Sequence, residues 1–145
     1  MGKELSYEER INQSKETRKA LYKSFQEILL KEKLNLYGFE IHICDPIDEN
    51  TLFNTNRDMF TSAHLTFKDC MFATITPQFL GSFKNERIEG MYLGRCGHDI
   101  IGSINYYRSE KGLEEIVVEK SHQTLQSCID EAERIRQEAV KFYSI

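Results

Sequence analysis

Two histidine–threonine pairs are the residues of this chain whose types and spacing best suit chemistry. They are the tripeptides His64-Leu65-Thr66 and His122-Gln123-Thr124. On a strand, residues two apart point to the same face, so each tripeptide would present one imidazole and one hydroxyl together. Two such pairs facing one groove would place an acid and a base on opposite sides of a phosphodiester, with hydroxyls to hold its oxygens.

This pair of tripeptides resembles the signature of the two-histidine phosphoesterases, and the resemblance is confined to these residues. It implies a phosphodiesterase acting on a nucleotide, with the catalytic residues His64, Thr66, His122 and Thr124. The first tripeptide lies in an alternating apolar and polar pattern, which is typical of a strand. The second departs from the family pattern, because Gln123 replaces an apolar residue. We also expect it at a helix start, where residues two apart do not share a face.

Histidine and cysteine occur two residues apart at two places, which makes a weak candidate metal site. The residues are His42, Cys44, Cys96 and His98. If the two segments were neighbours, four nitrogen and sulfur ligands could surround zinc tetrahedrally. Structural zinc sites usually use closely spaced cysteine pairs, which neither segment has, so we expect no metal and no other cofactor. The nearby glycine-rich stretch carries Arg87 and Arg95, which could meet an anion but are as readily solvated.

The segment 45–58 is strongly acidic and is expected to form a long loop. Its acidic residues are Asp45, Asp48, Glu49 and Asp58, with Arg57 as the one basic residue. Connections of this length inside a small domain are often functional. An acidic surface can compete for a basic groove on a partner. These four residues, with the helix face around Arg10 and Lys15, are therefore the candidate binding residues.

The composition argues against several classes of function. The formal net charge is −4 with 29% charged residues, which disfavours a nucleic-acid-binding footprint. Nucleic-acid binding stays as a second alternative, since Tyr92, Tyr106 and Tyr107 fall in expected strands and could stack bases. No apolar run approaches the roughly 20 residues that cross a bilayer. The N-terminus lacks the pattern of a secretion signal, so we expect no membrane contact and a cytoplasmic location.

Periodicity gives the order of the elements that would position these residues. The capping-box pattern of Ser6 and Glu9 begins a helix expected to reach about Leu34, polar in its first half. Alternation then predicts strands, and Pro77 is expected to end the third of them. Ser121 is expected to cap a closing helix with a strong apolar stripe. The expected strands span residues 37–44, 63–68, 70–75, 88–93, 99–107 and 115–119.

Strands that follow one another without intervening helices predict a mostly antiparallel sheet with helices on one face. The expected fold class is therefore α+β: an N-terminal helix, a central mostly antiparallel sheet of about five to six short strands, and a C-terminal amphipathic helix. We expect one domain over residues 1–145, with residues 1–15 as a projecting or mobile helical arm.

The helix–strands–helix order is similar to that of several small binding proteins, including type III secretion chaperones and phage- or mobile-element-encoded inhibitors. The resemblance implies a non-enzymatic protein whose partner is another protein. This agrees with the residues themselves, since no convergent catalytic set can be assembled from the sequence. The first prediction is therefore an inhibitor- or chaperone-like protein-binding module. A homodimer stays open, because two amphipathic helices on one sheet can leave apolar surface uncovered.

Overall fold

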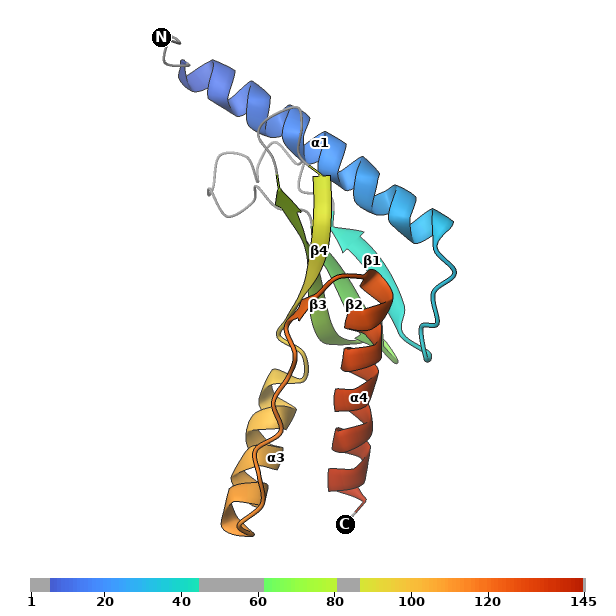
Figure 1. Ribbon diagram of the computed structural model, residues 1–145, viewed down its shortest axis with the longest axis vertical. Helices are drawn as coiled ribbons and strands as arrows, with labels where there is room; N and C mark the ends of the chain where they lie inside the picture. The colour runs from blue at the N-terminus through green and yellow to red at the C-terminus, as the bar shows by residue number, and fades with distance from the viewer. Residues whose placement is uncertain (1–5, 45–61, 81–86, 145) are drawn as a thin grey trace.

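The computed structural model describes residues 6–44, 62–80 and 87–144. These residues form an α+β fold with one antiparallel sheet, as predicted (Figure 1). The strands follow the order β1-β2-β3-β4-β5 across the sheet, so each strand pairs with its neighbour in the chain. The elements are α1 (Tyr7–Lys31), β1 (Glu40–Cys44), β2 (Ser62–Phe67), β3 (Cys70–Leu80), β4 (Arg87–Gly94), α3 (His98–Glu110), β5 (Ser121–His122) and α4 (Leu125–Tyr143).

The first half of the fold follows the local signals in the sequence. The hydroxyl of Ser6 accepts the Glu9 amide at 3.1 Å, as the capping box predicts. The helix ends at Lys31 and the first strand begins at Glu40, a few residues inside the predicted limits. Lys68 and Asp69 join β2 to β3 with φ angles of 48° and 65°. Two consecutive left-handed residues form the turn that matches the twist of a tight hairpin.

One face of the sheet is apolar and carries both long helices, as predicted. Ala63 and Leu65 of β2 alternate with polar residues and are fully buried. Phe25 of α1 and the apolar stripe of α4 pack on the same cluster. The remaining buried members are Phe39, Ala73, Ile75, Met91, Leu93, Cys96, Leu125, Cys128, Ile129, Ala132 and Ile135. The opposite face is polar, with His42, His64 and Thr74 in register across three strands.

The segment predicted as a strand at 99–107 is instead the helix α3. Its isoleucines favoured a strand, because β-branched residues have a weak helix propensity. The positions of Ile101 and Ile104 also fit a helical spacing, and Ile104 is buried. Packing against α4, where Tyr107 meets Phe142 edge-on at 5.5 Å between ring centroids, outweighs the local propensity.

Pro77 lies inside β3 opposite Met91, so the prediction that it ends the strand is wrong. A proline cannot donate to a ladder and is therefore confined to places paired on one side. In the described residues the pairing of β2 with β3 stops at Ala63 opposite Ile75. Pro77 thus lies where β3 has one described neighbour, β4, and its side chain fills the core.

Ser121 does not cap the closing helix. It pairs with Tyr92 in β5, which requires an extended backbone. Thr124, directly before the first helical residue, takes the capping role, and its hydroxyl accepts the Ser127 amide at 3.1 Å. Among the described residues there is no helix with the length and apolar character needed to span a bilayer.

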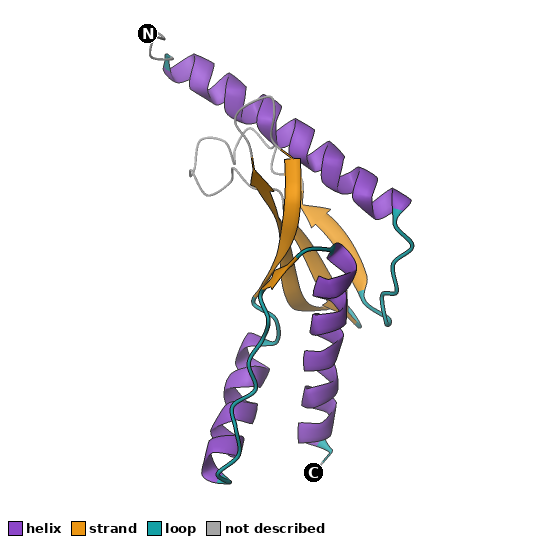
Figure 2. Cartoon of the chain, in the orientation of Figure 1, coloured by secondary structure: helices purple, strands orange, loops and turns teal. Residues whose placement is uncertain are grey.

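Residues 113–120 form an extended segment, here called the strap, and not the strand predicted at 115–119 (Figure 2). The strap covers in eight residues the length of the 13-residue helix α3, about 20 Å, so its backbone is stretched. Asn105 donates to the Ile116 carbonyl at 3.0 Å and accepts the Ile116 amide at 2.8 Å. The side chain of an α3 residue thus replaces the neighbouring strand that a ladder would supply.

The other side of the strap is held by an ion pair on α4. Glu131 accepts two hydrogen bonds from Arg134, at 2.6 and 2.9 Å, and a third from the Glu119 amide at 2.7 Å. Arg134 also donates to the Val117 carbonyl at 2.8 Å. The Glu131 side chain is 8% exposed. The hydrogen bonds from Arg134, and then that from Glu119, hold its pKa below the usual value of 4.5 against the effect of burial.

Replacing Glu131 by alanine is expected to lower the free energy of unfolding by about 2–3 kcal/mol, because the Glu119 amide and the Arg134 guanidinium lose a charged partner. Urea unfolding at neutral pH measures the effect. Since the folded pKa is lowered, the contribution of Glu131 is complete above pH 4.5 and is lost as the pH falls through the folded pKa. The difference between the wild type and the variant should therefore shrink in acid.

The matched control is Glu138→Ala on the same helix. Glu138 is half-buried and meets the exposed Lys141 at 3.5 Å in a single, solvent-screened pair, so its removal should cost less than about 0.5 kcal/mol. Equal losses for the two variants would show that Glu131 does not hold the strap.

Candidate binding site beside the strap

The two histidine–threonine tripeptides lie on opposite faces of the sheet. His64 lies on the polar face, because it alternates with the buried residues Ala63 and Leu65 of β2. His122 lies in β5 opposite Met91, whose side chain is buried on the face that the helices cover. Residues directly opposite each other on paired strands share a face. The imidazoles therefore do not face one groove.

The tripeptides are also far apart across the sheet. Two strands, β3 and β4, lie between β2 and β5. Three strand spacings correspond to about 14 Å. Thr124 in addition uses its hydroxyl to cap α4. The structure thus places His64 and Thr66 together on β2, far from His122 and Thr124. This geometry does not support the phosphoesterase hypothesis.

His122 instead forms a pair that the sequence did not reveal. Its Nδ1 lies 2.6 Å from the Ser127 hydroxyl, and its Nε2 lies 2.7 Å from the Glu119 carbonyl oxygen. A serine bonded to an oriented imidazole is the starting geometry of an activated nucleophile. Here the same ring also ties the strap to β5 and α4. Neither residue lines the two hollows described below, which favours a structural role for the pair.

The weak metal candidates do not converge in the described structure. His42 lies on the edge strand β1 and meets Glu40 at 3.4 Å, whereas Cys96 is buried after β4, three strands away. Across residues 6–44, 62–80 and 87–144, no group of three or more histidine, cysteine or acidic residues could hold a metal ion. Burial raises the pKa of the Cys96 thiol to about 12, so it is not a ready thiolate ligand.

The candidate binding residues from the sequence fall largely beyond what the structure describes. Asp45, Asp48, Glu49 and Asp58 lie outside the described residues. Arg10 and Lys15 lie in the first half of α1, where their backbone is helical. Their role in binding stays a prediction.

The three tyrosines considered for base stacking do not share a surface of the sheet. Tyr92 lies on the polar face of β4, level with Thr76 and Ser121. Tyr106 and Tyr107, expected on a strand, lie on α3, where Tyr106 is exposed and Tyr107 packs against Phe142. These three tyrosines therefore do not form a common stacking surface on the sheet.

A sharp turn joins β4 to α3 and opens two hollows. Arg95 and Gly97 have φ angles of 46° and 55°, and the Gly97 amide donates to the Phe72 carbonyl at 3.1 Å. A Cβ atom at position 97 would also lie 3.1 Å from the Ile135 side chain. Glycine is therefore favoured here both by the positive φ angle and by the lack of space. The turn directs the chain out of the sheet before β4 can pair further, and empty space remains on either side of it.

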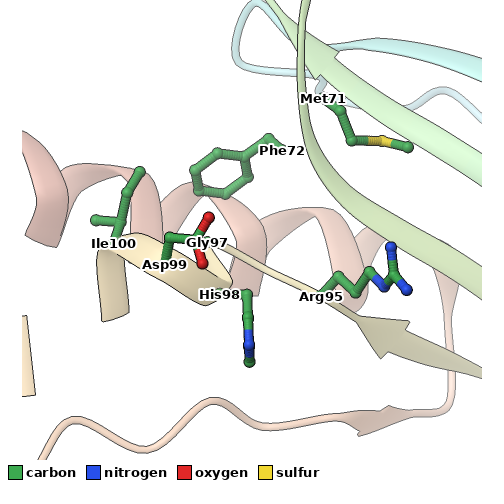
Figure 3. A pocket seen from close by; sticks show the side chains of 7 residues that line it. All are labelled: Met71, Phe72, Arg95, Gly97, His98, Asp99 and Ile100. Carbon is green, nitrogen blue, oxygen red and sulfur yellow. The ribbon is translucent and has the colours of Figure 1, made fainter. Parts of the chain in front are cut away.

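The first hollow, of about 410 Å³, lies between β3 and the start of α3. Figure 3 shows Met71 and Phe72 above that start, with the Arg95 and His98 side chains extending in different directions. The second hollow, here called the strap hollow, has a volume of about 390 Å³. It lies between the end of β4, the start of α3 and the strap, and it shares Arg95 and His98 with the first.

The strap hollow combines an apolar base with a charged rim. The base is formed by Leu93, Cys96, Ile101, Ile116 and Val118, and the rim by Arg95, His98, Asn105, Glu115, Val117 and Lys120. Within the described part of the chain, the side chains of Arg95, His98 and Lys120 have no hydrogen-bond or ion-pair partner. The sequence pointed to Arg95 as a residue that could meet an anion. It gave no sign of Lys120 or Val118, which come near Arg95 only through the path of the strap.

Comparison with known proteins gives no relative from which a role could be transferred. No protein-family model matches the chain, and no curated protein or solved structure matches it either.

Replacing His122 by alanine is expected to lower the free energy of unfolding by about 1–2 kcal/mol, because two hydrogen bonds that join the strap, β5 and α4 are lost. Denaturant unfolding measures it, with His98→Ala as the control, since the exposed His98 side chain has no described partner. A His122→Ala variant that keeps full stability but loses turnover of a cyclic nucleotide would contradict the structural role.

Proposed function

We propose that the chain is a non-enzymatic protein-binding module, inhibitor- or chaperone-like in its action. Figure 1 shows that α3, the strap and much of α4 extend beyond the sheet. The observation that supports the proposal most is the exposure of five large apolar side chains on these elements. We call this set the helical patch. Its members are Tyr106 of α3, Leu113 and Val117 of the strap, and Val140 and Tyr143 of α4, each between 48% and 71% exposed.

The helical patch has the composition of a protein-binding surface. Single exposed apolar residues are normal on a folded protein, but several on adjoining elements often mark an interaction site. Tyrosine is enriched in such sites because its ring gives contact area and its hydroxyl stays hydrated. Contacts between Tyr107 and Phe142 hold the ends of α3 and α4 together, so the patch rests on a packed base.

The first helix supplies a second exposed surface. Phe25 is buried in the core, but Tyr7 and Leu30 are exposed, and Leu30 is 82% exposed. The described side chains in the first half of α1, at Glu8, Glu9 and Glu16, are exposed as well. This arrangement suits the role that the sequence proposes for the exposed helix face.

Affinity capture with the full chain from a lysate of the source organism, with and without nuclease, tests the proposal. We expect one protein in both samples, and at least a tenfold weaker affinity for the variant Tyr106→Ser/Val117→Ser/Tyr143→Ser, about 1.4 kcal/mol. The control is Met71→Ser/Tyr92→Ser, which removes two exposed apolar side chains from the sheet. Capture that vanishes with nuclease, or equal binding by patch variant and wild type, would overturn the proposal.

A charge variant tests the acidic segment separately. The variant is Asp45→Asn/Asp48→Asn/Glu49→Gln/Asp58→Asn. Long-range attraction between acidic and basic surfaces acts mainly on the association rate, so we expect about tenfold slower association at low salt and a weaker dependence on salt. Kinetics with the captured partner measure both. An unchanged association rate would remove the acidic segment from the binding surface and leave the helical patch in place.

A further inference from the structure

The strap hollow gathers positive charge on a chain whose net charge is −4. The basic residues Arg95 and Lys120 line it, and so does His98. The one carboxylate on the rim is Glu115, whose nearest described polar contact is the Asn105 amide nitrogen at 3.5 Å. No ion pair within the described residues uses either cation. The hollow is therefore suited electrostatically to an anionic group.

The strap also offers an unused backbone donor there. In an extended chain, residues two apart direct their N–H and C=O groups to the same side. The Ile116 groups meet Asn105 of α3, and the Lys120 carbonyl accepts the Leu93 amide of β4 at 2.7 Å. Val118 lies between them, so its groups point into the space that β4 leaves when it turns into α3. They have no partner within the described part of the chain.

A backbone amide without a described partner, in a hollow that two cationic residues also line, defines the class of ligand. A carboxylate can accept from the Val118 amide with one oxygen while its charge faces the guanidinium and ammonium groups, and such charge-assisted bonds are the stronger kind. The base of the hollow, with Leu93, Ile101 and Ile116, is apolar and fits methylene groups next to the carboxylate. The cavity of about 390 Å³ holds a side chain and not a folded element.

We propose that the strap hollow binds an acidic side chain of a partner protein, with the Val118 amide donating to its carboxylate and with Arg95 and Lys120 balancing its charge. The inference rests on the proposed function, because it takes the partner to be a protein. Val117 belongs to the rim of the hollow and also to the helical patch. A partner segment that covers Val117 therefore lies next to the hollow.

Selection from a display library of random short peptides on the full chain tests the ligand class. The peptides are selected on the wild type and measured by fluorescence anisotropy. We expect enrichment of peptides with aspartate or glutamate beside apolar residues, and at least tenfold weaker binding to Arg95→Gly/Lys120→Ser. Glycine suits the φ of 46° at position 95, so this variant keeps the turn. The control Lys23→Ser/Lys33→Ser removes the same charge from exposed positions in and after α1 and should bind like the wild type.

Hydrogen exchange distinguishes the Val118 amide from its neighbour. Val117 also has an amide without a described partner, but this amide points to the other side of the strap. A bound acidic peptide should slow exchange at Val118 by at least about tenfold and change Val117 much less. Equal protection of both amides would overturn the assignment of the donor.

Each remaining outcome decides the inference. No enrichment, enrichment without acidic residues, or undiminished binding to the hollow variant would overturn it. Binding measurements with the captured partner distinguish failure of this inference from failure of the proposed function. If the partner binds Arg95→Gly/Lys120→Ser as strongly as the wild type but loses affinity for the helical-patch variant, the protein-binding function stands and the strap hollow is not the site.

Discussion

An extended segment without a neighbouring strand must satisfy its backbone groups by other means, and this constraint shapes the second half of the fold. The strap solves it with side chains. Asn105 acts toward Ile116 as a paired strand residue would, and Glu131 and Arg134 meet the groups on the other side. These bonds link α3, the strap and α4 in one network, so the position of each helix depends on the strap between them.

The same constraint explains why a hollow lies beside the strap. A neighbouring strand would have paired every second residue of the strap. The side chains of α3 and the end of β4 instead bond to Glu114, Ile116 and Lys120, and Val118 has no partner among the described residues. The left-handed residues Arg95 and Gly97 take the chain out of the sheet at the place where a strand would have met Val118. The space is therefore a consequence of the topology and does not depend on a packing defect.

Local patterns in the sequence predicted what local physics determines. The capping hydroxyl of Ser6, the alternation in β2 and the turn at Lys68 all follow from residues close in the chain. The strand predicted at 99–107 was wrong, because propensity favoured β-structure where packing on α4 favours a helix. The sequence could not predict on which face of the sheet His64 and His122 lie. The register between paired strands decides this, and a shift of one residue moves every side chain to the opposite face. The partners of the strap lie many residues away and leave no periodic signal.

The strap network also connects stability with occupancy of the hollow. Val117 and Glu119 are held from α4 by charged groups, whereas the Val118 backbone, on the opposite side of the strap, has no partner among residues 6–44, 62–80 and 87–144. A carboxylate bound at Val118 would add a bond where the strap has none, and a ligand that binds only the folded state stabilises it in proportion to its concentration over its Kd. The Glu131–Arg134 pair holds the strap in place before the ligand binds. Binding therefore costs little further conformational entropy. Loss of that pair would therefore weaken binding in the hollow although neither residue lines it.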